Sequence, residues 1–257
     1  MSGLLIVRPL PFTATANRGV GAENLASRDP KEVWADAGVS SPATITFDLG
    51  VDRLIDTVML GYIRPPAAGS VWIATGRTSA NAQVPLTVGT PYAPLRVEDV
   101  TGEFPAISHA LVRFPAGSYR YVDIQIAQPA GFEPLTAGVA VVGRAFEATL
   151  GREWGFGRQP LDTGSATPLP GGGFAVVDGA KKLRASWTFG DLSAAETDAL
   201  EAIALQIGRT APALVIEDAD RTAGLRHRIH YGLVDWRSWE RRNRPQTRWE
   251  LSIEEWA

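Results

Sequence analysis

Hydrophobic and polar residues alternate along two segments in the N-terminal half of the chain. Residues 44–49 read TITFDL and residues 121–126 read YVDIQI, so an apolar side chain occupies every second position in each. This period of two predicts half-buried β-strands, because successive side chains of a strand point to opposite faces. Turn-forming glycine and proline residues separate these segments from other strand candidates. The other candidates are residues 4–7, 54–62, 70–75, 110–114 and 139–144.

One segment in the C-terminal half has the period of an α-helix. Ser193 precedes this segment and Glu196 follows three positions later, which is the pattern of a capping box. Gly208 follows the segment, and glycine is the residue that most often ends a helix. The apolar stripe at helical spacing consists of Leu200, Ile203, Ala204 and Ile207.

Strand patterns flank this helix on both sides. Residues 183–189, 229–233 and 248–254 alternate between apolar and polar side chains, and residues 213–216 form a short apolar run. The Asp-Gly pair at residues 178–179 precedes the first of these strands and predicts a tight hairpin turn. The second half is therefore expected to be a small α+β unit, with one helix packed on an antiparallel sheet.

The composition narrows the class of protein. The chain has 257 residues, of which 45% are hydrophobic and 21% charged, as expected for a soluble globular protein with a sizeable core. Its net charge of −3 gives no global attraction to nucleic acid or to an anionic membrane. The absence of cysteine excludes disulfides and thiolate metal sites. No apolar stretch approaches the ~20 residues of a membrane helix, and residues 4–7 are expected to form a strand rather than a signal-peptide core.

Several short motifs follow one another in the N-terminal half: Asn24-Leu25, Trp34, Thr44–Gly50, Ile55–Leu60, Trp72-Ile73 and Tyr119–Ile126. In this order they resemble the discoidin or galactose-binding-like jelly roll, in which an Asp-Leu-Gly strand end precedes a second strand and an Arg-Tyr-Val-x-Ile strand comes late. The resemblance implies a sugar-binding-type scaffold over residues 12–148, with binding rather than catalysis as its role. The cysteine pair of many members is absent, and so is the His-plus-Arg sugar-contact pattern of fucose-binding lectins.

The order of elements after residue 150 has a resemblance of its own. A strand with Trp187, the capped helix, a short strand, the Gly232–Val234 strand and a final Trp249–Trp256 segment follow one another. This order is similar to the small tail-tube-like domain of phage minor and distal tail proteins, which forms a ring at the end of the tube. The resemblance implies assembly into a ring, with the extra β-sandwich projecting outward.

A change of composition separates the two halves. Residues 149–173 are rich in glycine, proline, threonine and serine, and the glycine triplet at residues 171–173 is expected to act as a flexible hinge. We therefore divide the chain into a galactose-binding-like jelly roll (1–148), a linker or arm (149–173) and a tail-tube-like assembly domain (174–257). The expected fold class is mainly β, with an N-terminal jelly-roll β-sandwich and a smaller C-terminal α+β domain.

The loops at one end of such a jelly roll are the expected place for a ligand. Arginine and asparagine can bond to sugar hydroxyls, and an exposed tryptophan can stack on a sugar face. A competing interpretation places Trp34 and Trp72 in the hydrophobic core, where tryptophan is found more often. The candidate ligand-binding residues are Arg18, Asn24, Trp34, Arg64, Trp72 and Arg77.

Arginine and tryptophan residues gather between the last two predicted strands. Both residue types are favoured at protein–protein hot spots, and arginine beside aromatic rings can also grip nucleic acid by stacking. In a chain of net negative charge we favour a subunit interface, then a solvated loop, and place nucleic acid last. The candidate interface residues are Trp236, Arg237, Trp239, Arg241, Arg242 and Arg244.

No pattern of residues indicates catalysis or a metal site. His227 and His230 would point to opposite faces of a strand and are expected to be surface histidines. Ser108 and His109 are adjacent but lack the third group and the oxyanion site of a nucleophile–base pair. The acidic residues 217–220 could hold calcium, although a solvated turn is their more frequent role. We therefore assign no catalytic residue, no metal ligand and no cofactor.

Together these patterns favour a structural component of the distal tail, at the tail tip or baseplate, of a long-tailed phage or phage-like particle. The expected partners are copies of itself in a ring, neighbouring tail-tube and tail-hub proteins, and host surface glycans, with no nucleic acid and no membrane insertion. Such a protein would be made in the host cytoplasm and reside in the virion. The alternative is a bacterial carbohydrate-binding module protein without catalytic activity. A glycan-processing enzyme would need an acid–base pair, for which Asp48 and Asp56 are the candidates.

Overall fold

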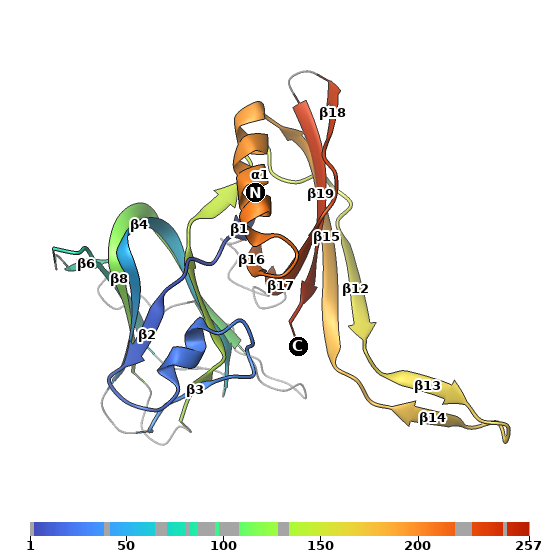
Figure 1. Cartoon of the computed structure of the whole chain (residues 1–257), viewed down its shortest axis with the longest axis horizontal. Coiled ribbons are helices and arrows are strands. Elements are labelled where there is room, and N and C mark those ends of the chain that lie inside the picture. Colours follow the sequence, from blue (N-terminus) through green and yellow to red (C-terminus); the bar gives the residue numbers. More distant parts are fainter. Residues whose placement is uncertain are drawn as a thin grey trace.

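The computed structural model shows two β-rich parts side by side, with a long hairpin arm projecting from the second (Figure 1). The described strands pair in antiparallel fashion into two large sheets and two small ones. One α-helix, α1 (Ala194–Ile207), accompanies them in the described residues, and the predicted mainly β fold class is confirmed. The structure describes residues 3–38, 42–64, 71–80, 83–86, 96–97, 108–127, 134–218, 228–243 and 246–256.

The N-terminal part is a jelly roll whose main sheet has the order β10-β4-β8-β5-β6, with β2 beside β4 and β7 beside β8. Its two longest strands, β4 (Ala43–Ile63) and β8 (Ser108–Ala127), bend together where their register shifts between Asp48 and Arg53. The other elements are β2 (Thr13–Ala16), η1 (Ala22–Ala26), β3 (Trp34–Ala35), β5 (Val71–Arg77), β6 (Gln83–Pro85), β7 (Arg96–Val97), β9 (Thr136–Ala137) and β10 (Val139–Gly143).

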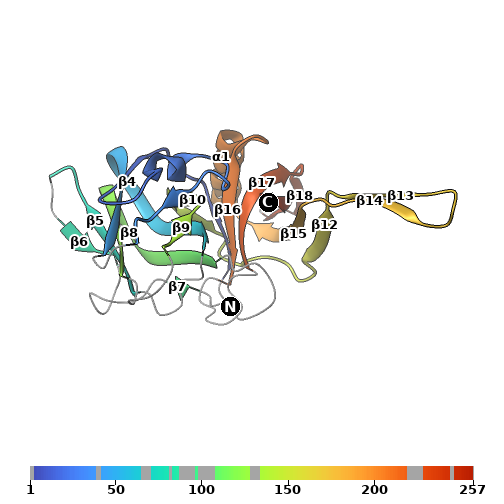
Figure 2. The same ribbon diagram turned by 90° about the horizontal axis from the view of Figure 1, so that it is seen from below.

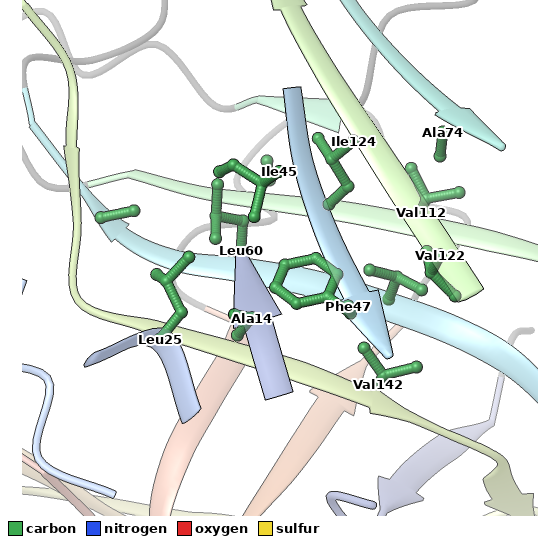
Figure 3. Packing of buried hydrophobic residues seen from close by; sticks show 14 of the residues in the cluster. Ala14, Leu25, Ile45, Phe47, Leu60, Ala74, Val112, Val122, Ile124 and Val142 are labelled. Atoms are coloured by element: carbon green, nitrogen blue, oxygen red, sulfur yellow. The ribbon is translucent and has the colours of Figure 1, made fainter. Parts of the chain in front are cut away.

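The hydrophobic core of the jelly roll follows the alternation seen in the sequence. Ile45 and Phe47 on β4 are fully buried, whereas Thr46 and Asp48 on the opposite face are half-buried. Phe47 lies among aliphatic side chains from other strands, including Val122 of β8 (Figure 3). The two predicted half-buried strands are therefore confirmed, and their inner faces form this core.

The C-terminal part is a larger sheet in the order β11-β1-β16-β17-β19-β15-β12, with β18 beside β19. Strand β1 (Leu4–Val7) pairs with β11 (Ala145–Glu147) on one side and with β16 (Pro212–Glu217) on the other. Its continuous apolar run is what a strand covered on both faces requires. The remaining strands are β12 (Gly157–Asp162), β15 (Lys181–Leu192), β17 (Ile229–Trp236), β18 (Glu240–Asn243) and β19 (Gln246–Glu255).

Strand pairing crosses the division of the chain expected from the sequence. Residues 4–7 were grouped with the jelly roll, but they pair within the C-terminal sheet, more than two hundred residues away along the chain. Strand β12, which falls inside the expected linker 149–173, pairs with β15 of the same sheet. Hydrogen bonding between distant segments decides this membership, and no local pattern records it. The boundaries at residues 148 and 173 themselves remain a prediction.

Helix α1 begins and ends as its sequence predicts. The Ser193 side chain accepts a hydrogen bond from the Glu196 N–H, and the Glu196 carboxylate accepts one from the Ser193 N–H, so the capping box is present. Gly208 ends the helix with a φ of 60°. Leu200 and Ile207 are buried against the C-terminal sheet. Within the described residues, no helix combines the length and apolar character needed to cross a membrane.

A hydrophobic cluster joins the two parts of the molecule. Leu5 and Val7 of β1 and Leu214 of β16 pack with Met59 and Val141 of the jelly roll. All five side chains are 0% exposed. Because burying a large aliphatic side chain contributes roughly 1.5–3 kcal/mol, we expect this shared cluster to make the two parts unfold together.

Tyr62 adds polar contacts at the edge of this interface. Its hydroxyl donates a hydrogen bond to the main-chain oxygen of Trp256 at 2.8 Å, and its N–H donates to Nδ1 of His109 at 3.2 Å. Its φ of 57° is unusual for a residue other than glycine, and it lies at a register shift of β4. Burial raises the pKa of its hydroxyl far above the ordinary value. The end of the chain is thus tied directly to the jelly roll.

The arm extends away from the C-terminal sheet (Figure 2). At its base β12 pairs with β15, and farther out β13 (Ser165–Pro168) pairs with β14 (Phe174–Val177). At the tip, the Leu169 N–H donates to the Gly173 oxygen at 2.8 Å, and Gly172 takes a φ of 86°. The glycine triplet expected to be a hinge therefore forms the turn of a hairpin.

The predicted tight turn at residues 178–179 is wrong. These residues connect β14 to β15 while the chain continues in the same general direction (Figure 1). Their neighbours across the arm are residues 163–164, and the Thr163 hydroxyl bridges the two segments through hydrogen bonds with Ala180. The Asp-Gly pair marks a break between two ladders of the hairpin, where the Gly164 backbone comes so close to Gly179 that a Cβ there would clash.

Replacing Leu214 with alanine should lower the free energy of unfolding by about 2–5 kcal/mol, because it opens a cavity in the cluster shared by both parts. Urea denaturation followed by tryptophan fluorescence and by circular dichroism should show one transition in both wild type and variant. Leu205→Ala is the matched control, since Leu205 is 80% exposed on α1 and should change stability by no more than about 0.5 kcal/mol. Two separate transitions in the wild type would contradict this coupling.

Candidate functional site

Three of the predicted ligand-binding residues come together around η1, where they hold the scaffold. Arg18 donates two hydrogen bonds to Asp36, at 2.6 and 2.7 Å, and the two side chains are 9% and 1% exposed. Trp34 is fully buried, and its indole N–H donates to the main-chain oxygen of Arg18 at 3.3 Å. The Asn24 amide donates to the main-chain oxygen of Val33 at 3.0 Å. Trp34 thus takes the core position of the competing interpretation.

Two further candidates lie on strands or bridges of the jelly roll. Arg64 exchanges two main-chain hydrogen bonds with Thr136, at 2.9 and 2.7 Å, and its side chain is exposed. Trp72 lies in β5 opposite Ile126 of β8, and its side chain falls outside the described residues. A common ligand-binding role for the candidate residues remains a prediction.

Arg77, the last candidate, belongs to a chain of paired charges on β4, β5 and β8. It donates two hydrogen bonds to Asp123, at 2.8 and 3.3 Å, and its guanidinium carbon lies 4.6 Å from the centre of the Tyr121 ring. Arg120 lies 4.8 Å from the same ring and donates two hydrogen bonds to Asp48, at 2.9 and 3.1 Å. The Arg120 hydrogen bond lowers the pKa of Asp48, and the Asp123 hydrogen bond raises the pKa of Arg77.

The two aspartates considered for hydrolysis make separate structural contacts. Asp48 pairs with Arg120, whereas Asp56 accepts hydrogen bonds from the Ala145 N–H and the Thr57 hydroxyl, both at 2.8 Å. The Asp48 carboxylate thereby joins β4 to β8 within the jelly roll, whereas the Asp56 carboxylate joins β4 to β11 of the C-terminal sheet. This arrangement supports their structural interpretation over an acid–base pair, which would require a shared opening for a sugar.

Trp236, the candidate interface residue at the end of β17, is partly buried in the C-terminal part, whereas Arg237 is exposed. Trp236 packs against its hydrophobic cluster and contacts the Trp249 ring edge-on, with ring centres 6.0 Å apart. The Trp249 indole N–H donates to the main-chain oxygen of Arg237 at 2.7 Å. These contacts hold the turn between β17 and β19, so part of the arginine–tryptophan pattern serves packing within one chain.

The rest of the arginine–tryptophan group is closer to the surface. Trp239 is 38% exposed, and the guanidinium carbon of Arg241 lies 6.0 Å from its ring centre. Arg242 lies in β18, but its side chain falls outside the described residues, as does the whole of Arg244. The interface role of the group remains a prediction.

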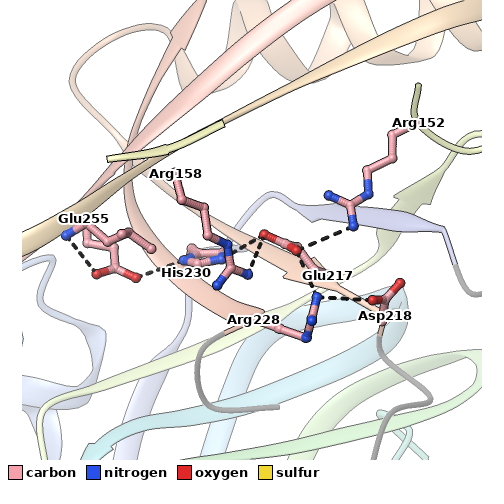
Figure 4. Close-up of polar contacts among 8 residues, drawn as sticks. Arg152, Arg158, Glu217, Asp218, Arg228, His230 and Glu255 are labelled. Carbon is pink, nitrogen blue, oxygen red and sulfur yellow. Dashed lines mark hydrogen bonds and ion pairs between the residues drawn. The ribbon is translucent and has the colours of Figure 1, made fainter. Parts of the chain in front are cut away.

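A buried group of charges that the sequence did not reveal lies at the end of β16. Glu217 is 0% exposed, and its carboxylate lies 3.0 Å from Arg158, 3.2 Å from Arg228 and 3.5 Å from Arg152. His230 lies 3.3 Å from the same carboxylate. These side chains converge on Glu217 from different segments (Figure 4). A carboxylate buried so deeply requires such partners, because an unpaired charge in the interior costs several kcal/mol.

His230 links Glu217 to Glu255 and is fully buried, in contrast to its expected place on the surface. Its Nδ1 lies 2.8 Å from the Glu255 carboxylate, and its ring centre lies 5.6 Å from that of Trp187. Burial alone would lower the pKa of His230, but the two carboxylates outweigh it and raise the pKa. Burial would raise the pKa of Glu217, but contacts with His230 and the arginines lower it.

This Glu217 cluster anchors the base of the arm. Arg152 and Arg158 flank the Phe156 ring, at 4.2 and 5.7 Å from its centre, and both reach Glu217. The calcium role considered for residues 217–220 does not suit this arrangement, because arginines already surround the Glu217 carboxylate. Of those acidic residues, Asp220 lies outside the described residues.

The Glu217 cluster should make stability depend on pH on both sides of neutrality. The folded pKa of His230 lies above 6.5, so its contribution is complete below that pH and is lost as pH rises through the folded pKa. The folded pKa of Glu217 lies below 4.5, so its contribution is complete above that pH and is lost as pH falls through the folded pKa.

The variant His230→Gln should therefore be less stable than wild type by about 1.5–3 kcal/mol at pH 6, with a gap that narrows as pH rises to 9. Melting temperatures measured across this pH range test the expectation. Asp235→Asn serves as the control, since it removes an exposed ion pair with Arg209 and should shift the melting temperature little at any pH. A gap between wild type and His230→Gln that is independent of pH would count against a protonated His230.

Among known proteins, solved structures resemble this chain in fold over about half of its length. No family model matches the chain, and no curated protein matches it. A chitosan-binding module of a chitosanase/glucanase from Paenibacillus sp. IK-5 is similar, with 18% identity, coverage of 53% of this chain and 98% of the module, and a TM-score of 0.41.

Two other solved structures are similar over a comparable share. The family 32 carbohydrate-binding module of Clostridium perfringens NanJ, solved with galactose, has 14% identity, coverage of 54% and 98%, and a TM-score of 0.40. The lectin binding domain of lectinolysin, solved with Lewis b, has 17% identity, coverage of 53% and 96%, and a TM-score of 0.40. At such identities and TM-scores this likeness assigns no ligand and no activity to the chain.

Proposed function

We propose that this chain is a non-catalytic protein in which a C-terminal domain that assembles with copies of itself carries a glycan-binding jelly roll. The jelly-roll sheet of residues 13–143 and its sugar-binding-type sequence motifs support the glycan-binding component. The projecting arm supports the assembly component. Both components are binding functions, in agreement with the structural roles of the carboxylates once considered for hydrolysis.

The arm is the observation that carries assembly. Phe174, Val176 and Val177 of β14 are each 66% exposed, and Leu169 at the tip is 48% exposed. The register places Phe174 beside Pro168 and Val176 beside Ala166, so these apolar residues share one face of the hairpin. An isolated two-stranded hairpin is only marginally stable in water. A partner that covers the apolar face would stabilise the arm and shield it from solvent.

A second copy of the chain is the partner we propose for the arm. Strand β12 ends the order of the C-terminal sheet, and its residues are almost entirely exposed, so its outer edge can pair with another chain. Repetition of such a heterologous contact closes a ring when the rotation between copies allows it. The proposed setting is the distal tail of a long-tailed phage or phage-like particle, which rests on the arm and on the order of elements alone.

The alternative is a bacterial carbohydrate-binding module protein that does not assemble. The jelly-roll fold favours this alternative, and none of the solved structures named above is a tail protein. The two proposals differ in the arm. A carbohydrate-binding protein that acts alone gives no reason for an apolar hairpin exposed to solvent, whereas a self-assembling protein requires such a surface.

The double variant Phe174→Ser/Val176→Ser should weaken self-association at least tenfold, because it removes the apolar face of the arm. Sedimentation velocity over a range of protein concentrations, together with electron microscopy of negatively stained protein, measures the effect. Leu205→Ser is the matched control, because Leu205 is even more exposed, at 80%, but lies on α1. A wild-type protein that stays monomeric at all concentrations would sink the assembly component and leave the alternative.

A further inference from the structure

Three neighbouring strands of the jelly roll place polar side chains on the face opposite the hydrophobic core. Between β4 and β8, Thr46 lies opposite Asp123 and Asp48 lies opposite Tyr121. Between β8 and β5, Tyr121 lies opposite Arg77. Because directly paired residues of a sheet point to the same side, these five side chains form one continuous surface. We call this surface, together with the next pair along, the polar sheet face.

The next pair along the strands extends this surface without charge. Thr44 of β4 lies opposite Gln125 of β8, and both side chains are half-buried. On each strand, the residues that alternate with these polar positions, such as Ile45 and Ile124, are buried in the core on the other side of the sheet. From the usual spacing of strands, three strands span roughly 10 Å, and two steps of alternation along a strand add roughly 13 Å. The polar sheet face is therefore broad and shallow rather than a closed pocket.

The charged side chains of this face are held in order by one another. Arg77 donates two hydrogen bonds to the Asp123 carboxylate, and the Thr46 hydroxyl donates one to the same carboxylate at 2.6 Å. The Tyr121 ring lies within 5 Å of the Arg77 guanidinium carbon, at 4.6 Å. A guanidinium has five N–H donors, more than the two used in each pair. Donors and acceptors are thus pre-arranged, which lowers the entropy cost of binding a ligand.

Charge and exposure together indicate the kind of ligand. Arg120 also lies on this face, because it pairs with Asp48 and lies against the Tyr121 ring. The two arginines, Arg77 and Arg120, balance Asp48 and Asp123, so these four side chains carry no net charge. The side chains of Arg77, Arg120 and Asp48 are 28%, 32% and 30% exposed, so a ligand can reach them. A balanced set of donors and acceptors suits closely spaced hydroxyl groups better than a carboxylate or sulfate. Ile73 of β5, opposite Gln125, is the aliphatic side chain among the paired residues of this face, which leaves little apolar surface to bind a protein partner.

We infer that the polar sheet face is the glycan-binding surface of the jelly roll and that it takes a neutral, hydroxyl-rich polysaccharide chain. This inference rests on the proposed glycan-binding function and names its site and ligand class. The guanidinium N–H groups and carboxylate oxygens of the two ion pairs form hydrogen bonds with hydroxyl groups of adjacent sugar units. Thr44 and Gln125 contact the next sugar unit of the polysaccharide. Arg77 thus belongs to this proposed binding surface, whereas Arg18, Asn24 and Trp34 lie elsewhere, around η1.

Affinity electrophoresis of the full chain tests the inference, with galactan, mannan and β-glucan as neutral probes and alginate as a uronic-acid probe. The wild-type protein should be retarded by at least one neutral polymer and not by alginate. The double variant Thr44→Val/Gln125→Ala removes a hydroxyl and an amide without touching the ion pairs, and it should weaken binding at least fivefold. Gln206→Ala is the matched control for the amide, since its exposed side chain lies on α1, off this face, and it should bind within twofold of wild type.

Melting temperatures accompany each variant, and Gln125→Ala alone replaces the double variant if the latter loses stability. Binding of a neutral polymer that the face variants leave unchanged would overturn the site and preserve the proposed glycan-binding function. Binding to alginate alone would overturn the ligand class. Binding to none of the four polymers would overturn the inference together with the glycan-binding component, and self-association through the arm would stand as a separate result.

Discussion

Strand β1 is the element on which the arrangement of the molecule depends. Leu4 and Ile6 point into the core beneath α1, whereas Leu5 and Val7 point into the interface with the jelly roll. None of the four side chains is more than 1% exposed. The strand is also hydrogen-bonded on both sides, to β11 and to β16. With neither a face nor an edge in water, β1 cannot move without opening two hydrophobic clusters at once.

The Glu217 cluster sets the second junction, at the base of the arm. Glu217 is buried at the end of β16, and three arginines meet its carboxylate: one from the segment before β12, one from β12 and one from the residue before β17. Removing one partner of such a group leaves a buried charge uncompensated, so the cluster holds its members together even where it adds little net stability. The arm therefore leaves the sheet from a fixed base, although its own residues are largely exposed.

The molecule consequently presents two surfaces of opposite chemistry on one body. The arm exposes Phe174 and its apolar neighbours, which favour association by removing hydrocarbon from water. The polar sheet face offers ordered charges and hydroxyls, which favour a hydrogen-bonding ligand. The two lie on different parts of the chain, so the assembly we propose through the arm would leave the polar sheet face open to a ligand. A protein of this kind can hold a binding module at a defined place in a larger structure.

The sequence by itself determined the elements that depend on near neighbours. The alternation around Ile45 and Ile124 sets which faces of β4 and β8 are buried, and the spacing of Ser193 and Glu196 caps α1. These features are predictable because a strand repeats every two residues and a helix turn closes within four. The mainly β fold class follows from the same local patterns.

Only the tertiary structure decided which distant segments meet. The pairing of Leu5 with Ile216 moves the start of the chain into the C-terminal sheet, and His230 becomes buried because Glu217 and Glu255 receive it. Arg77 reaches Asp123 only because β5 and β8 pair in one register. Each of these contacts joins residues that have no local pattern in common. Their selection depends on the burial of whole strands and on the cost of leaving charges unpaired, and both are properties of the complete fold.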